Sequence, residues 1–353
     1  MKLLICTQAI DLDDPILGFF CRWVEEFSKH CESVHVICLK EGKHSLPANI
    51  RVHSLGKPSV AKAMEGEGTR FLSRIKYVWN FYKYIWTLRN EYDAVFVHMN
   101  QEYVLLGGLL WKFLGKRIFF WRNHYAGSLW TDIASALSTK VFCTSKFSYT
   151  AKFKKTVIMP VGVDTSTFKP LSGERDPAGI LFLARMAPSK KAHILVDALK
   201  PLHERGTNFR ASFYGSALPR DSAYYAELQE KVRVAGLSGV VRFHAGVPNT
   251  ETPKIYNEHA IFVNCSSSGM YDKTIFEAAA CGTLVLAASR DFATLVPLRF
   301  SYVADDVKDI AAKLEALLSL SENERKEASI ELLELADKNS LATLGARLVQ
   351  ETG

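Results

Sequence analysis

Residues 260–287 read AIFVNCSSSGMYDKTIFEAAACGTLVLA, and this stretch decides the fold. An apolar run is followed by a Ser/Gly loop, a helical pattern that ends near Gly282, and a second short apolar run. Continuous apolarity is typical of strands that are buried on both faces, so the two runs predict parallel strands joined by a helix. One carboxylate, Glu277, stands inside the helical run, where the pattern asks for a core residue.

The same alternation of strand and helix repeats along nearly the whole chain. Helical patterns at 190–206 and 223–236 each end at a glycine, which is the expected stop signal. We therefore expect an α/β protein built from βαβ units. The apolar runs that predict its strands lie at 2–6, 33–39, 93–99, 117–121, 140–145 and 156–160, and then at 179–184, 210–215, 240–246, 260–266 and 283–288.

The break between the two series of strands has the composition of a linker. Residues 163–179, VDTSTFKPLSGERDPAG, are rich in Pro, Gly, Ser and charge, and 353 residues are enough for two domains. We predict two doubly wound, Rossmann-like domains that face a cleft, over 1–165 and 178–335, with a linker at 166–177. The segment 336–353 is predicted to be a helix that can cross back to the N-terminal domain. Ligands of such domains bind at the carboxyl ends of the strands.

The composition narrows the partners and the compartment. The 44 basic and 37 acidic residues give a net charge of +7, which suits nucleotides, phosphates or an acidic membrane surface. Dense basic blocks are missing, so nucleic acid is not an expected partner. The seven cysteines form no CxxC pair and predict no zinc site, and no apolar run reaches the roughly 18 residues of a membrane span. We expect a cytosolic protein.

The loop and helix after residue 264 have the general geometry of a phosphate cradle. Free N–H groups and the helix dipole favour an anion at such a helix start. Asp272 is a candidate N-cap whose side chain accepts from the N–H of Thr274 or Ile275. Glu277 lies about one turn inside the helix, so a buried carboxylate would need donors, and sugar hydroxyls are suitable ones. A water-facing Glu277 is the alternative.

A pair of cations follows another buried strand. In LFLARMAPSKK (181–191) Arg185 stands at the end of the predicted strand. Lys190 follows five residues later, at the start of the next predicted helix. A forked guanidinium and a mobile ammonium can together neutralise a diphosphate. Two solvated surface cations remain the alternative interpretation.

ARMAPSKK (184–191) and FEAAACGTLVLA (276–287) together resemble the donor domain of the retaining GT-B glycosyltransferases of family four. PVGVDTSTF (160–168) looks like the domain junction of that family, and GKRIFFWRNH (115–124) looks like one of its acceptor-domain strands. The resemblance implies that Arg185 and Lys190 hold the donor diphosphate and that Glu277 holds the nucleotide ribose. It also implies a nucleotide-sugar donor and a glycan or lipid-linked acceptor. Metal dependence is not expected, because no Asp-x-Asp motif stands at a strand end on the donor side, and no other cofactor is expected.

One departure from the family concerns the sugar contact. The family has a second glutamate eight positions before the first, and Gly269 stands at that position here. We therefore hypothesise that the loop supplies a different sugar contact through Asp272 or Lys273. The donor-binding residues predicted in this segment are Gly269, Met270, Tyr271, Asp272, Lys273, Thr274 and Glu277.

The N-terminal domain is expected to carry the acceptor. Gly18 resembles the glycine loop of the family, where the backbone approaches the donor closely, although Leu17 stands where a second glycine is usual. His124 corresponds to the active-site histidine near the sugar. His98 and Asn123 are further acceptor-side candidates, with a buried structural role equally open for His98.

The segment 70–89, RFLSRIKYVWNFYKYIWTLR, predicts a helix that is rich in aromatic and basic residues. Phe71, Ile75, Val78, Tyr82 and Ile85 repeat at helical spacing and predict a stripe packed on the sheet. The same composition suits an anionic membrane surface, so a peripheral contact on the inner face of the cytoplasmic membrane is a second expectation.

The leading prediction is a retaining hexosyltransferase in surface polysaccharide or glycolipid assembly. A nucleotide-sugar epimerase of the same fold and a non-catalytic nucleotide-sugar-binding protein remain alternatives, the second because of Gly269. A dinucleotide-dependent oxidoreductase is disfavoured, because CTQAIDLDDPILG (6–18) has one glycine where the GxGxxG motif needs three.

Overall fold

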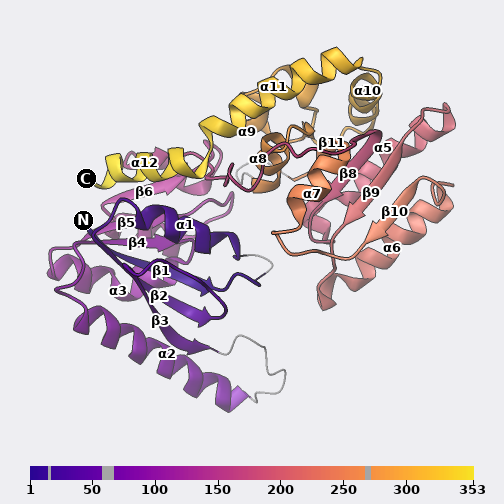
Figure 1. The fold of residues 1–353 in the computed structure, drawn as a ribbon. Coiled ribbons are helices and arrows are strands. Elements are labelled where there is room, and N and C mark those ends of the chain that lie inside the picture. Colours follow the sequence, from indigo (N-terminus) through magenta and orange to yellow (C-terminus); the bar gives the residue numbers. More distant parts are fainter. Residues whose placement is uncertain (15–16, 58–66, 267–271) are drawn as a thin grey trace. The chain divides into compact units, whose positions relative to one another are not determined.

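The computed structural model describes residues 1–14, 17–57, 67–266 and 272–353 (Figure 1). The chain forms two compact units. The first contains Met1–Gly162 together with Leu341–Gly353, and the second contains Val163–Ser340. The predicted linker at 166–177 therefore lies within the second unit, and the C-terminal segment from Leu341 lies within the first.

The first unit is built on a parallel sheet of seven strands in the order β3-β2-β1-β4-β5-β6-β7. The strand order reverses between β1 and β4, which makes the sheet doubly wound and places a ligand crevice at their carboxyl ends. The strands are β1 (Lys2–Ile10), β2 (Ser33–Glu41), β3 (Ile50–Lys57), β4 (Ala94–His98), β5 (Arg117–Trp121), β6 (Lys140–Cys143) and β7 (Thr156–Ile158).

Helices cover both faces of this sheet (Figure 1). On one face α1 (Phe19–Ser28) packs with α12 (Leu341–Thr352), where Trp23 and Phe27 share a buried cluster with Leu344. On the other face lie α2 (Glu67–Thr87), α3 (Gln101–Phe113) and α4 (Leu129–Leu137), whose inward residues include Phe81 and Trp111. A short 3-10 helix, η1, spans Tyr149–Lys152.

The second unit has a parallel sheet of five strands in the order β10-β9-β8-β11-β12, which reverses between β8 and β11. Its strands are β8 (Asp176–Leu183), β9 (Arg210–Tyr214), β10 (Val241–His244), β11 (His259–Asn264) and β12 (Leu284–Ala287). Its helices are α5 (Ala192–Glu204), α6 (Ser222–Val234), α7 (Thr252–Glu258), α8 (Lys273–Ala280), α9 (Arg290–Ala293), α10 (Val307–Leu318) and α11 (Glu322–Lys338), with 3-10 turns η2 (Pro188–Lys190), η3 (Pro219–Asp221) and η4 (Leu298–Phe300).

The fold class predicted from the sequence is confirmed. Each predicted strand is present, and the predicted helix stops at Gly206, Gly236 and Gly282 hold positive φ angles of 75°, 72° and 71°. Strand β3 was not predicted. It lies at the sheet edge and pairs only with β2; most of its residues are exposed or half-buried, and it lacks a continuous apolar run.

Helix α2 is present, but the prediction of its buried side was wrong. Ile75, Val78 and Tyr82 are exposed, and the helix instead packs on the sheet through Phe81 and Ile85. Ile85 is the residue that the two sets share. The side chain of Phe71 lies outside the described residues.

Candidate functional site

The two predicted cations lie directly after β8, at the point where the strand order of the second unit reverses. Arg185 follows the end of the strand, and Lys190 closes the 3-10 turn η2 before α5 begins. The Lys190 ammonium lies 2.5 Å from Oδ2 of Asp272 and 3.3 Å from Oγ of Ser266, both of which follow the neighbouring strand β11. Ser266 donates to the same carboxylate oxygen at 3.1 Å. The structure therefore joins two predicted segments in one polar cluster.

Asp272 stands at the N-cap of α8, but the predicted capping hydrogen bond is absent. Its carboxylate points to Lys190 instead. Burial alone would raise the pKa of Asp272, but the charge and the hydrogen bond of Lys190 outweigh burial and lower it to about 2. The carboxylate is therefore ionised at neutral pH and holds the ammonium at the carboxyl ends of β8 and β11.

Glu277 is buried on α8, with 5% of its surface exposed, so the water-facing alternative is excluded. Its two donors are distant: Asn249 Nδ2 lies 3.4 Å from Oε1, and the Tyr256 hydroxyl lies 3.3 Å from Oε2. Burial raises the pKa of Glu277 above its ordinary value, against the lowering effect of Lys273 and these two donors. The carboxylate thus keeps acceptor capacity for further donors.

Arg185 has a hydrogen-bond donor that no described residue accepts from. Its Nε is buried and has no hydrogen-bond partner within the described part of the chain. A buried donor without a partner is costly, so its satisfaction by a ligand would be favourable. Arg185 and Lys190 both belong to the short connection between β8 and α5.

The remaining predicted donor residues follow the loop into α8. Lys273 and Thr274 form the first turn of the helix, and the Thr274 hydroxyl accepts a hydrogen bond from Asn264 Nδ2 at 3.3 Å. Gly269, Met270 and Tyr271 lie outside the described residues.

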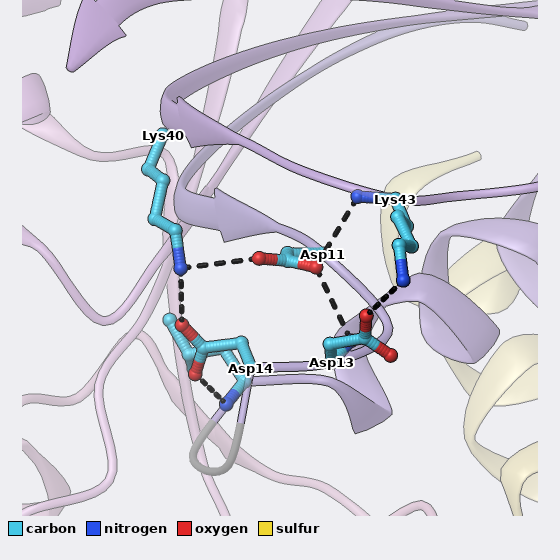
Figure 2. Close-up of polar contacts among 6 residues, drawn as sticks. Asp11, Asp13, Asp14, Lys40 and Lys43 are labelled. Atoms are coloured by element: carbon cyan, nitrogen blue, oxygen red, sulfur yellow. Dashed lines mark hydrogen bonds and ion pairs between the residues drawn. The ribbon is translucent and has the colours of Figure 1, made fainter. Parts of the chain in front are cut away.

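An ion-pair network fixes the loop that follows β1 in the first unit (Figure 2). The Lys40 ammonium lies 3.1 Å from Asp11 Oδ2 and 3.3 Å from Asp14 Oδ2, and so joins the end of β2 to the loop. Asp11 Oδ1 accepts from the backbone N–H groups of Asp13 and Lys43, each at 3.2 Å. Lys43 also pairs with Asp13 at 3.1 Å. These aspartates therefore connect the described part of the loop to Lys40 and Lys43.

Gly18 ends this loop and precedes α1. A Cβ atom on Gly18 would lie 2.8 Å from the carbonyl oxygens of both Leu12 and Asp14, so the folding of the loop itself requires glycine. Its N–H donates to Asp14 O at 2.9 Å. The requirement for glycine has a local cause, and an approach to a ligand remains a prediction.

The acceptor-side candidates have three different environments. His124 is half-buried after β5, where Nδ1 lies 2.9 Å from the N–H of Ala126 and the ring stacks on Tyr125. Asn123 Oδ1 accepts from Ser148 Oγ at 2.9 Å, which ties the loops after β5 and β6 together. His98 is buried and stacks on Phe20 with ring centroids 4.1 Å apart.

Three residues near the site carried no sequence signal of their own. Ser266 contacts Lys190, while Asn249 and Tyr256 contact Glu277. Asn249 and Tyr256 precede Glu277 by 28 and 21 residues, so only the fold brings them together. Within the described residues, no group of three or more His, Cys, Asp and Glu is placed to hold a metal ion.

Models of two known protein families match this chain. A model described as "Glycosyl transferases group 1" matches residues 177–320, which include Arg185, Lys190 and Glu277. A second, described as "Glycosyl transferase 4-like", matches residues 14–121. The chain belongs to the group 1 glycosyl transferases.

This group 1 glycosyl transferase matches curated relatives over part of their length. It is 29% identical over 155 residues to a D-inositol 3-phosphate glycosyltransferase of Kineococcus radiotolerans, covering 40% of this chain and 36% of the relative. It is also 29% identical to the mannosylfructose-phosphate synthase of Agrobacterium fabrum, over 38% of this chain and 33% of that one. The chain therefore spans about a third of the length of these relatives.

Solved structures match the transferase over nearly its whole length. Anabaena Alr3699/HepE in complex with UDP has a TM-score of 0.78 at 17% identity and covers 99% of each chain. Sucrose-phosphate synthase from Thermosynechococcus elongatus also has a TM-score of 0.78, at 15% identity, covering 99% of this chain and 98% of that one. At these identities the likeness supports the GT-B fold alone.

Proposed function

We propose that this protein transfers a hexose from a nucleoside-diphosphate sugar to a glycan or lipid-linked acceptor, with retention of the anomeric configuration. The observation that carries the proposal is the Lys190–Asp272 pair at the carboxyl ends of β8 and β11, with Arg185 in the same connection as Lys190 and Glu277 on the helix that Asp272 precedes. A doubly wound sheet binds its ligand at this point. The Anabaena structures in complex with UDP and with UDP-glucose are consistent with such a donor.

In this proposal the donor completes the unsatisfied groups of the cluster. Arg185, which has an unpartnered buried Nε in the described part of the chain, and Lys190 bind the two phosphates. The N-terminus of α8 adds N–H groups and a favourable dipole. Glu277 accepts from the ribose hydroxyls, which are better donors for it than Asn249 at 3.4 Å.

The proposed reaction breaks the bond between the anomeric carbon and the diphosphate oxygen through an oxocarbenium-like state. The acceptor oxygen bonds to the same face of that carbon, and its proton passes to the leaving phosphate. Arg185 and Lys190 stabilise the charge that grows on the diphosphate, so the proposal needs no metal ion. His124 hydrogen-bonds the sugar and orients it, and Gly18 allows the backbone a close approach.

The proposed setting is the assembly of a surface polysaccharide or glycolipid on the inner face of the cytoplasmic membrane. The exposed aromatic and basic residues of α2 support a peripheral contact there. Among the helices in the described part of the chain, none is long and apolar enough to span a bilayer.

A second candidate is a protein that binds the nucleotide sugar without transferring it, and Gly269 in place of the family glutamate favours this alternative. An epimerase of the same fold is a third, and it would need no acceptor. Turnover of the donor that depends on an added acceptor separates the transferase from both.

A thermal-shift panel with UDP, GDP, ADP, CMP and NAD tests the nucleotide site. At about a hundred times its dissociation constant, a ligand adds roughly 2.7 kcal/mol to the free energy of unfolding. We expect one nucleoside diphosphate to produce this shift and Arg185→Ala to abolish it. Arg233→Ala, which removes an exposed guanidinium from α6, is the matched control and should keep the shift. A shift with NAD alone, or with no diphosphate, would overturn the proposal.

A further inference from the structure

Three neighbouring helices of the first unit expose large apolar side chains to solvent. The exposed fractions run from 37% for Leu106 and Ile133 to 83% for Phe113. We call this surface the three-helix face and define it by the outward sides of α2, α3 and α4. Its most prominent members are Trp79 and Trp86 on α2, Leu109 and Phe113 on α3, and Leu129 and Trp130 on α4.

These side chains form one continuous surface because the three helices cover the same side of the sheet. Figure 1 shows α2 and α3 side by side, and the inward residues of all three helices share one buried cluster. The Tyr82 hydroxyl donates to Leu106 O at 2.9 Å, which joins α2 to α3. The Thr131 hydroxyl contacts Gln101 Oε1 at 2.7 Å, which joins α3 to α4.

Helix α2 shows most clearly that both of its sides are apolar. On α2, residues 72, 75, 79, 82 and 86 follow helical spacing on the outward side, whereas Phe81 and Ile85 are buried on the inward side. The sheet accounts for the inward side only. Monomeric proteins rarely expose apolar patches larger than a few hundred Å², so the outward side indicates a binding surface.

The charges on this face favour an anionic partner. Between residues 68 and 90 the sequence contains no acidic residue, and exposed Lys76 and Lys83 alternate with the apolar side chains. The Arg89 guanidinium lies over the Trp86 ring at 4.7 Å. Glu102 is exposed at the start of α3, and Asp132 on α4 is paired with Lys152 at 2.9 Å. Protein interfaces are depleted in lysine, whereas tryptophan and lysine together are typical of a membrane interface.

We propose that the whole three-helix face, not α2 alone, lies on the headgroup region of an anionic bilayer. The proposal rests on the proposed function and specifies its acceptor as one that is carried on a lipid. Helix α4 begins five residues after His124, so Leu129 and Trp130 lie in its first turn, near the carboxyl end of β5, which His124 follows. A lipid-borne acceptor would then reach the His124 loop from the membrane surface.

Vesicle co-sedimentation tests this surface with the full chain. We use vesicles of phosphatidylglycerol and phosphatidylcholine, or of phosphatidylcholine alone, at about 0.05 M and about 0.5 M salt. We expect binding to the anionic vesicles that weakens at high salt. Trp79→Glu, Phe113→Glu and Trp130→Glu should each weaken it about fivefold or more, as expected for one unfavourable charge at the surface. Leu298→Glu, at a residue 76% exposed in the second unit, is the matched control and should bind normally.

Three results would overturn the inference. The first is no binding to anionic vesicles at low salt. The second is normal binding by the Phe113 and Trp130 variants, which would confine the contact to α2. The third is a concentration-dependent dimer that the same variants dissociate, because the face would then cover a second copy. The nucleotide thermal shift is measured on every variant, and its persistence would show that the proposed nucleotide site is intact even where the membrane inference fails.

Discussion

At the scale of single residues, Glu277 shows a conflict between stability and the proposed function. A buried carboxylate with two donors at 3.3 and 3.4 Å is poorly compensated. The folded structure therefore bears a cost at the position where the ribose is proposed to bind. Sites of this kind are commonly destabilising in the free protein.

Glu277→Gln should therefore stabilise the free protein and weaken its binding of nucleotide. Burial raises the pKa of Glu277, so its contribution to stability is present below its ordinary value of 4.5 and is lost as the pH rises through the folded pKa. At neutral pH the neutral amide should raise the free energy of unfolding by roughly 1–2 kcal/mol. Thermal melts with and without the nucleoside diphosphate that stabilises the unmodified protein measure both effects. Exposed Glu227→Gln is the control, and a variant that is less stable yet shifts normally would contradict the prediction.

Part of this site could be predicted from the sequence. Arg185, Lys190 and Glu277 were singled out because each stands at a fixed place in a strand-loop-helix pattern; their roles came from the family resemblance and stay predictions. The Lys190–Asp272 pair was missed, and Asp272 was predicted to cap its own helix. A cap depends on local sequence, whereas the pair joins residues 82 positions apart in the segments that follow adjacent strands, and spacing along one chain does not reveal it.

At the scale of elements, the edge pair β2–β3 contains two stacked histidines. His35 is buried, and its Nδ1 lies 3.0 Å from Nε2 of His53 while its Nε2 lies 3.2 Å from Glu91. Arg51 is also close, and the residues around His35 line a cavity of about 230 Å³ at the amino ends of the strands. Burial lowers the pKa of both histidines; Arg51 adds to this effect and Glu91 opposes it.

This pair should make stability fall in mild acid. Because both folded pKa values lie below the ordinary value of 6.5, the unfolded chain binds more protons in this range. The contribution is present above about pH 6.5 and is lost as the pH falls through the folded pKa values. Thermal melts between about pH 8 and about pH 5.5 should show the loss. His53→Gln should flatten the profile, and exposed His203→Gln should not; equal profiles for all three proteins would refute the assignment.

Strands and helices could be predicted where their burial produces a recognisable pattern of apolar residues in the sequence. Strands β1 and β5 were found because each contains an unbroken apolar run, and β3 was missed because it contains none. On α2 the periodicity indicated a helix, but two of its sides are apolar, and the predicted stripe lay on the exposed one. A hydrophobic pattern shows that a side is apolar and does not show what covers it.

At the scale of the whole molecule, the chain leaves the first unit at Gly162 and re-enters it at Leu341. The exit is tightly packed: Trp23 Nε1 donates to Gly162 O at 2.9 Å, and a Cβ at Gly162 would lie 2.4 Å from Leu344. Gly162 also has a φ of 74°, so glycine is required for both space and backbone conformation. The last helix, α12, thus completes the core of the unit that contains the first strand.

Two units with separate cores should be separable by mutation. Leu344→Ala opens a cavity beside Trp23 and should cost about 2–5 kcal/mol of the first unit alone. Leu332→Ala, at a fully buried residue of α11, is the matched change in the second unit. We expect calorimetry to show two unfolding transitions, each lowered by one of these variants.

The bound nucleotide identifies the transitions, since the nucleoside diphosphate that stabilises the unmodified protein should raise only the transition that Leu332→Ala lowers. The proposed donor groups Arg185, Lys190 and Glu277 all lie in the second unit. A single transition that both variants lower equally would mean that the two cores unfold as one cooperative block. A nucleotide shift confined to the transition that Leu344→Ala lowers would place the nucleotide in the first unit and contradict the proposed site.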